Sequence, residues 1–258
     1  GVAMGGRGTD AARQVSDMVL RDDAFSTIVA AVEQGRVIFD NIRKALMFML
    51  CTNVAEVTAV GLASLMGAPL PLRALQILFL NVVTDVFPAL ALGVGKGNGH
   101  EMEQSPRQRD EPIMTRDHWL GIGGWSAALA GCVLAALAVG ILWMELPTAS
   151  AVTLSFLTLA FGKLWFVFNL RDVESDTLRN EVTRNPWVWA ALGACVVLLL
   201  AAVYLPGLST VLDTRPPGAA GWSLVLGLSL LPLIGGQFLR LAQRRRMEWQ
   251  SGREQEVK

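Results

Sequence analysis

The sequence predicts an all-α polytopic membrane protein in which six transmembrane helices follow a short α/β segment. Composition is the first reason, because 52% of the 258 residues are hydrophobic and only 17% are charged. Ordinary soluble domains are about a quarter charged. The second reason is length, because apolar runs recur that reach the roughly 20 residues needed to cross a bilayer as a helix. These runs show no sustained alternation of apolar and polar residues, which argues against strands.

Residues 1–40 are expected to form the α/β segment, with short buried strands in GVAMG and in Asp17–Leu20. Thr9–Ser16 is expected to be a helix capped by Thr9, and a longer helix is expected from Asp22 onward, with acidic residues in its first turn. So short a segment cannot close a core of its own. The chain also starts at Gly1 without a signal-peptide pattern. We therefore expect it to be part of a longer protein.

Four linkers arrange the apolar runs into hairpins. The runs lie at 45–66, 74–95, 119–144, 149–170, 187–205 and 220–241. The linkers 67–73 and 145–148 are short and contain proline, whereas 96–118 and 171–186 are longer and charged.

Basic residues predict the orientation of the spans, because Lys and Arg accumulate in cytoplasmic loops. Six basic residues precede the first span and six follow the last one. Four more lie in the linker 96–118 and three in the linker 171–186. Only Arg73 and Arg215 fall on the other side. Both termini are therefore expected to be cytoplasmic. The basic stretch Gln243–Arg246 is interpreted as part of this anchor, with lipid-headgroup binding as the alternative.

Charge and cysteine content exclude two classes of partner and site. The 22 Lys and Arg balance the 22 Asp and Glu, which argues against a nucleic-acid partner. Cys51, Cys132 and Cys195 each lie in an apolar run, so that neither a disulfide framework nor a CxxC metal site is indicated.

Three charged residues, Glu56, Asp85 and Lys163, are predicted deep within the spans, where a charge is costly and usually functional. Two helix faces collect further oxygen-bearing side chains beside the acids. Asn53 lies three residues before Glu56, and Asn81 and Thr84 share a face with Asp85. Carboxylate, amide and hydroxyl oxygens suit a hard cation such as calcium, magnesium or manganese, or an alkali ion or proton.

Two further residues bear on this predicted site. Pro88 lacks an N–H, so that the carbonyl of Thr84, four residues earlier, is expected to be freed. An irregular backbone at membrane depth is tolerated where it lines a cavity. Lys163 is expected to modulate the site by pairing with the two acids, or alternatively to extend its long stem to the cytoplasmic edge.

Four segments resemble, in order and spacing, the C-terminal portion of P-type cation-transporting ATPases, in particular sarcoplasmic-reticulum-type calcium pumps and their bacterial relatives. They read GVAMGGRGTDAARQVSDMVLRDDAFSTIVAAVEQGRVIFDNIRKAL, TNVAE, LQILFLNVVTDVFPALALG and SPRQRDEPIM. The resemblance implies that 1–40 is the remnant of the phosphorylation domain. It further implies that 41–245 is the transmembrane domain, with helices five to ten of a ten-helix pump, and that 246–258 is a cytoplasmic tail.

The resemblance also implies a role for the predicted ligands. In the family, the residues that match Asn53, Glu56, Asn81, Thr84 and Asp85 coordinate the transported ion, calcium or another cation. Two positions depart from the family pattern, because Val86 stands where Gly is common and Lys163 falls where calcium pumps have an acidic or amide ligand. The expected partners are the lipid bilayer and the N-terminal part of the pump, and the expected location is a bacterial plasma membrane.

The motifs that would drive transport do not occur in this chain. It contains neither the DKTG phosphorylation motif nor TGDGVNDAP, and hence no catalytic residue is assigned. Magnesium and ATP are therefore expected to act only in the intact pump. The alternative is a non-enzymatic membrane protein, either a secondary transporter or channel that uses the same acids for protons, or an inert truncated product.

Overall fold

The computed structural model describes residues 1–97, 99–103, 105–106, 112–171 and 180–256, with side chains through residue 237. Among the described residues, six helical segments are long and apolar enough to cross a membrane. They are Ser26–Leu65, Ala74–Gly93, Arg116–Leu142, Thr148–Asn169, Pro186–Tyr204 and Gly218–Gln237. The predicted all-α polytopic fold is confirmed.

The N-terminal segment is a small βαβ unit. Strands β1 (Val2–Met4) and β2 (Met18–Leu20) pair in parallel, and α1 (Asp10–Val15) connects them. The predicted cap is confirmed, because the Thr9 hydroxyl accepts a hydrogen bond from the Ala12 amide. The strands are less buried than predicted: each has one buried residue, since within the described chain they pair only with each other.

Helix α2 (Ser26–Leu65) joins this unit to the bundle as one continuous helix of 40 residues. At 1.5 Å per residue it is about 60 Å long, about twice the hydrocarbon thickness of a bilayer. The predicted start at Asp22 is wrong, and the first turn carries no acidic residue. The Asp22 carboxylate instead accepts hydrogen bonds from the Ala24 amide and the Thr27 hydroxyl, which holds the chain in a turn before the helix begins.

The second span is interrupted by a π turn. It consists of α3 (Ala74–Leu80), a π-helical turn η1 (Asn81–Asp85) and α4 (Val86–Gly93). π turns insert one extra residue into a helix and are frequent at functional sites. After α4 come a short 3₁₀ turn η2 (Glu101–Glu103) and then α5 (Arg116–Leu142).

Helix α6 (Thr148–Phe166) is the centre of the bundle, and it continues into the 3₁₀ turn η3 (Val167–Asn169). Its membrane-spanning window is 89% buried, against 22–44% for the other five. It packs against α5 and α9, and it also contacts α2 and η1. A side chain on α6 therefore faces protein rather than lipid.

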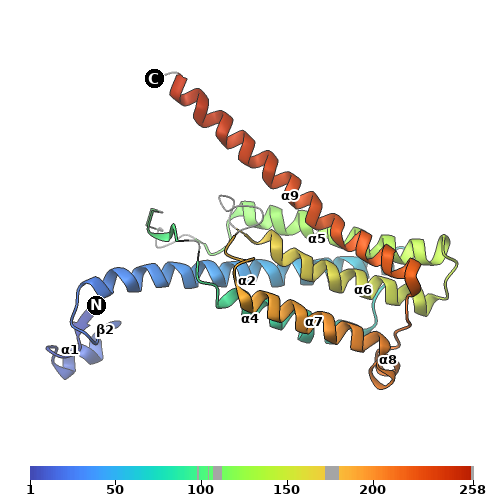
Figure 1. The fold of residues 1–258 in the computed structure, drawn as a ribbon, viewed down its shortest axis with the longest axis horizontal. Coiled ribbons are helices and arrows are strands. Elements are labelled where there is room, and N and C mark those ends of the chain that lie inside the picture. Colours follow the sequence, from blue (N-terminus) through green and yellow to red (C-terminus); the bar gives the residue numbers. More distant parts are fainter. Residues whose placement is uncertain (98, 104, 107–111, 172–179, 257–258) are drawn as a thin grey trace.

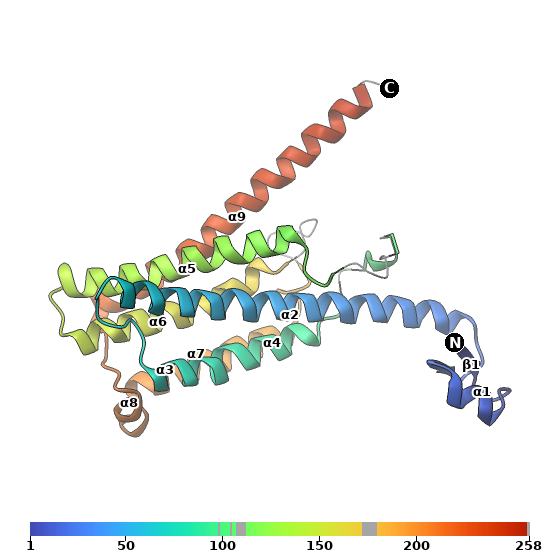
Figure 2. The ribbon, with the colours of Figure 1, turned by 180° about the vertical axis from the view of Figure 1, so that it is seen from behind.

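The last elements are α7 (Pro186–Tyr204), the short α8 (Pro206–Leu212) and α9 (Gly218–Glu256). Helix α9 extends well past the end of the bundle (Figure 1). The βαβ unit and the C-terminal part of α9 lie at the same end of the bundle, together with η2, whereas α8 and the α5–α6 turn lie at the opposite end (Figures 1 and 2). Arg107, Arg109, Arg179 and Lys258, which contributed to the predicted orientation, lie outside the described residues.

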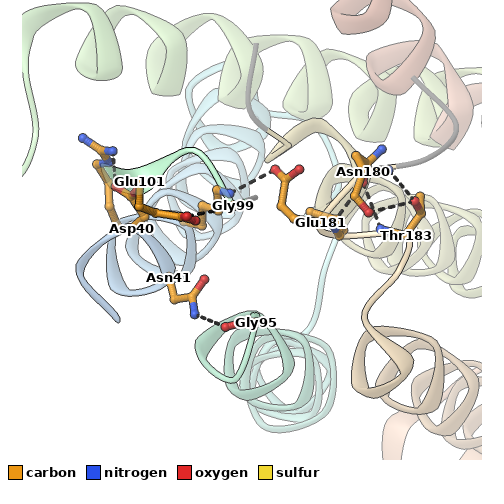
Figure 3. A network of polar contacts seen from close by, with 11 residues as sticks. Asp40, Asn41, Gly95, Gly99, Glu101, Asn180, Glu181 and Thr183 are labelled. Carbon is orange, nitrogen blue, oxygen red and sulfur yellow. Dashed lines mark hydrogen bonds and ion pairs between the residues drawn. The ribbon is translucent and has the colours of Figure 1, made fainter. Parts of the chain in front are cut away.

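A polar network holds the end of α4 that lies near the termini (Figure 3). The Asn41 side-chain amide donates to the Gly95 carbonyl at 2.7 Å, and that of Asn185 donates to the Ala91 carbonyl at 2.7 Å. Nearby, Lys44 of α2 forms an ion pair of 3.0 Å with Glu181. Because helix ends leave carbonyls without partners, the two amides both satisfy and anchor this end of the helix.

The opposite end of the bundle is held by a second polar cluster. Arg73, before α3, forms an ion pair of 2.6 Å with Asp213, and the buried Gln76 amide donates to the Leu212 carbonyl at 3.0 Å. The second span is thus fixed to its neighbours at both ends.

The contact of α9 with Trp125 of α5 predicts that alanine will have opposite effects on stability at two adjacent glycines. A Cβ at Gly236 would lie 1.9 Å from the Trp125 ring, whereas nothing lies within 4 Å of one at Gly235. The Trp125 ring packs on Phe166, with centroids 5.5 Å apart, and has little room to shift. We expect Gly236→Ala to destabilise the bundle by about 1–3 kcal/mol.

Gly235→Ala is the matched control and should be neutral or stabilising by up to about 1 kcal/mol, because alanine favours helix. Thermal unfolding of the detergent-solubilised chain measures both. Equal melting temperatures for the two variants would contradict the described α5–α9 packing.

Candidate cation site

Three helices each bring one charged side chain to the interior of the bundle. Glu56 lies on α2, Asp85 at the end of the π turn and Lys163 on α6. Their exposed fractions are 4%, 3% and 0%. They are far apart in sequence, and they meet because α6 lies against both α2 and η1.

The ammonium of Lys163 bridges the two carboxylates. Its Nζ lies 2.9 Å from Glu56 Oε2, 3.1 Å from Asp85 Oδ1 and 3.3 Å from Asp85 Oδ2. An ammonium has three N–H donors, so that each can be directed at one of these oxygens. The alternative in which Lys163 extends to the edge of the membrane does not hold in this structure, where its side chain is fully enclosed.

Cys195, which the sequence did not single out, forms a hydrogen bond with the backbone of the π turn. The Cys195 thiol of α7 donates to the Val83 carbonyl at 3.2 Å. Pro88 lies in α4, just after the π turn, and the release of the Thr84 carbonyl by this proline stays a prediction. No periodicity marks a lone cysteine in an apolar helix.

The neutral predicted ligands lie on the same helical segments as the acids, Asn53 on α2 with Glu56, and Asn81 and Thr84 in the π turn with Asp85. Thr84 is fully buried, and its hydroxyl donates to the Leu80 carbonyl at 2.9 Å, which leaves its oxygen able to accept or coordinate. The Asn81 Oδ1 atom is enclosed and has no hydrogen-bond partner. Asn53 is half-buried on α2. Within the described chain, no hydrogen bond joins either asparagine to Glu56 or Asp85.

The arrangement has a definite charge and ligand chemistry. With both acids ionised, two carboxylates and one ammonium leave a net charge of −1. No cluster of three or more His, Cys, Asp or Glu side chains suited to a metal occurs among the described residues. Any cation held here would therefore depend on two carboxylates supplemented by amide, hydroxyl and backbone oxygens, the hard ligands that calcium and alkali ions accept.

Comparisons with known proteins agree with this architecture. The family described as "Cation transporting ATPase, C-terminus" matches residues 69–242. A calcium-transporting ATPase of Bacillus subtilis is 36% identical over 246 residues, which cover 93% of this chain and 27% of that protein. Calcium-transporting ATPase 1 of Bacillus cereus is 32% identical over 258 residues, covering 95% of this chain and 29% of that protein.

A third relative is named for a different cation. P-type sodium-transporting ATPase4 of Toxoplasma gondii is 51% identical over 142 residues, which cover 55% of this chain and 11% of that protein. The matched part of this chain thus covers between about a tenth and three-tenths of the length of these relatives. With its six spans and buried acids, the chain belongs to the cation-transporting ATPase family and corresponds to the C-terminal, membrane-spanning portion of a P-type cation ATPase.

Proposed function

We propose that this chain forms the cation pathway of a P-type ATPase and that it transports calcium or another divalent cation. The observation that carries the proposal is the meeting of Glu56 and Asp85 in the bundle interior, beside a π turn. Buried carboxylates are costly unless a cation or hydrogen bonds compensate them, and within the described part of the chain one ammonium pairs with the two.

In this proposal Glu56 and Asp85 supply charge, and Asn53, Asn81 and Thr84 supply neutral oxygens. The unpartnered Asn81 Oδ1 supports this assignment, because an enclosed acceptor without a donor is a ready cation ligand. Lys163 would modulate the site through its contacts with both acids.

Helix α2 offers a mechanical connection to the site. It runs without a break from the βαβ unit to Glu56 and beyond, and it extends far out of the bundle (Figure 2). In the proposed pump, 1–40 belongs to the phosphorylation domain, 41–245 forms the transmembrane domain and 246–258 is the cytoplasmic tail. A movement of the phosphorylation domain would then act on Glu56 through one rigid element.

The remaining machinery is assigned to other parts of the proposed pump. Magnesium and ATP would act on the actuator, nucleotide-binding and phosphorylation domains, and helices one to four would pack against this bundle. Both termini would face the cytoplasm of a bacterial cell. A secondary transporter or an inert product would need none of these parts, which makes dependence on ATP the deciding property.

Sodium is a second candidate for the transported ion. The observation in its favour is the net charge of −1, which one monovalent cation would neutralise, and a relative is named a sodium-transporting ATPase. Calcium is favoured because the relatives named for calcium match nearly the whole chain, whereas the sodium-transporting relative matches 55% of it.

The chain by itself should not hydrolyse ATP. We expect the purified 258-residue chain to form no acid-stable phosphoenzyme, because it has no aspartate in a DKTG context to accept the phosphoryl group. Incubation with radiolabelled ATP, followed by acid quenching, measures this. Cation-stimulated ATP turnover by the chain alone would refute the proposal that ATP binding and phosphorylation require other parts of the pump.

In the intact pump, Glu56→Gln and Asp85→Asn should each weaken the apparent affinity for the transported cation by about 100-fold or more. Loss of one of two carboxylates in a desolvated site removes several kcal/mol of binding, and about 2.8 kcal/mol corresponds to 100-fold. The readout is phosphorylation by ATP as a function of calcium concentration and, in parallel, of sodium concentration, which also separates the two candidate ions.

Glu33→Gln and Asp117→Asn are matched controls, because both side chains are exposed and lie away from the interior acids. They should retain the wild-type cation dependence. If the interior and the control variants behaved alike, Glu56 and Asp85 would be structural and the site would lie elsewhere.

A further inference from the structure

We propose that the Lys163 ammonium permanently occupies one cation position of this site, so that a single divalent cation binds per transport cycle. The inference rests on the proposed function and adds the stoichiometry of the site and the residue that sets it. It starts from the geometry of three side chains on α2, η1 and α6.

The ammonium lies where a coordinated cation would lie. Its Nζ has three carboxylate oxygens within 3.3 Å, one from Glu56 and two from Asp85. A calcium ion would hold such oxygens at about 2.3–2.6 Å, somewhat closer than an ammonium does. Both species therefore compete for the same space between the same two carboxylates.

The packing around Lys163 keeps the ammonium there. Its side chain has no exposed surface, and α6 and α5 approach so closely at the neighbouring Gly162 that a Cβ there would lie 2.3 Å from Leu129 Cδ1. The inner end of α6 near Asn169 is six residues away, about 9 Å along the axis. Within the described part of the chain, Lys163 forms ion pairs with Glu56 and Asp85 alone.

Charge balance then limits the number of divalent cations. The two carboxylates and the ammonium sum to −1, so that one divalent cation brings the cluster to +1 and a second would bring it to +3. In a low-dielectric interior such an excess of like charge is strongly unfavourable. With a neutral side chain at position 163 the cluster would start from −2, two divalent cations would bring it to +2 instead of +3, and the position held by the ammonium would be open to the second cation.

The transported cation would then bind to oxygens of α2 and the π turn that do not contact Lys163. These oxygens include Glu56 Oε1 and Asn81 Oδ1, and the latter has no hydrogen-bond partner. Thr84 lies on the same turn as Asn81 and Asp85. A single cation can thus share the acids with the ammonium without displacing it.

Ion counting on the intact pump tests this inference. Binding of radioactive calcium, divided by the number of phosphorylatable molecules, should give one ion for the wild type. Lys163→Gln should raise the apparent calcium affinity at least about tenfold, because it removes one positive charge in direct contact with both acids. Lys96→Gln makes the same change at an exposed lysine and should leave both values unchanged.

Lys163→Arg keeps the charge and should keep the count of one, which provides a test if Lys163→Gln does not fold. Two calcium ions per wild-type molecule would overturn the inference and leave the proposed function intact. An unchanged count and affinity in a folded Lys163→Gln variant would overturn it as well. Failure of the wild type to bind any cation would instead refute the proposed function, and the inference with it.

Discussion

The buried contact of one ammonium with two carboxylates is the constraint on which the arrangement of the bundle depends. Lys163, Glu56 and Asp85 come from three separate helices, and each would be too costly to bury alone. Their mutual attraction offsets part of that cost only when α2, η1 and α6 are held in register. The three helices are therefore bound to one another by charge as well as by apolar packing.

This constraint accounts for the central place of α6. A membrane-spanning helix that carries a buried ammonium in its last turn cannot expose that face to lipid, and α6 is the most enclosed of the six spans. The surrounding helices supply the enclosure, with α5 and α9 on its apolar faces and the acids of α2 and η1 on its charged one. Trp125 and Phe166 pack at the α5–α6 contact, close to Gly236 of α9.

The second span is held at both ends by polar clusters and is irregular in its middle, at the π turn. Asn41 and Asn185 hold the α4 end, and Gln76 with Arg73 holds the α3 end. Between them η1 carries Asp85 and an enclosed, unpartnered amide oxygen. The irregular backbone of η1 thus lies between two fixed ends of the same span.

The sequence alone determined the six spans, the βαβ unit and the candidate acids, because long apolar runs, capping residues and charges in apolar surroundings are local signals. Hydropathy identifies the spans, and Glu56, Asp85 and Lys163 are recognisable as charged residues within apolar runs. The true start of α2 at Ser26 and the π turn were not predictable, since each depends on side-chain hydrogen bonds or backbone register that local pattern does not encode. Only the tertiary structure decided that Lys163 joins the acids instead of reaching the membrane edge. The sequence is compatible with both positions of the ammonium. The packing of α6 against its neighbours encloses the Lys163 side chain and so selects the position beside the acids.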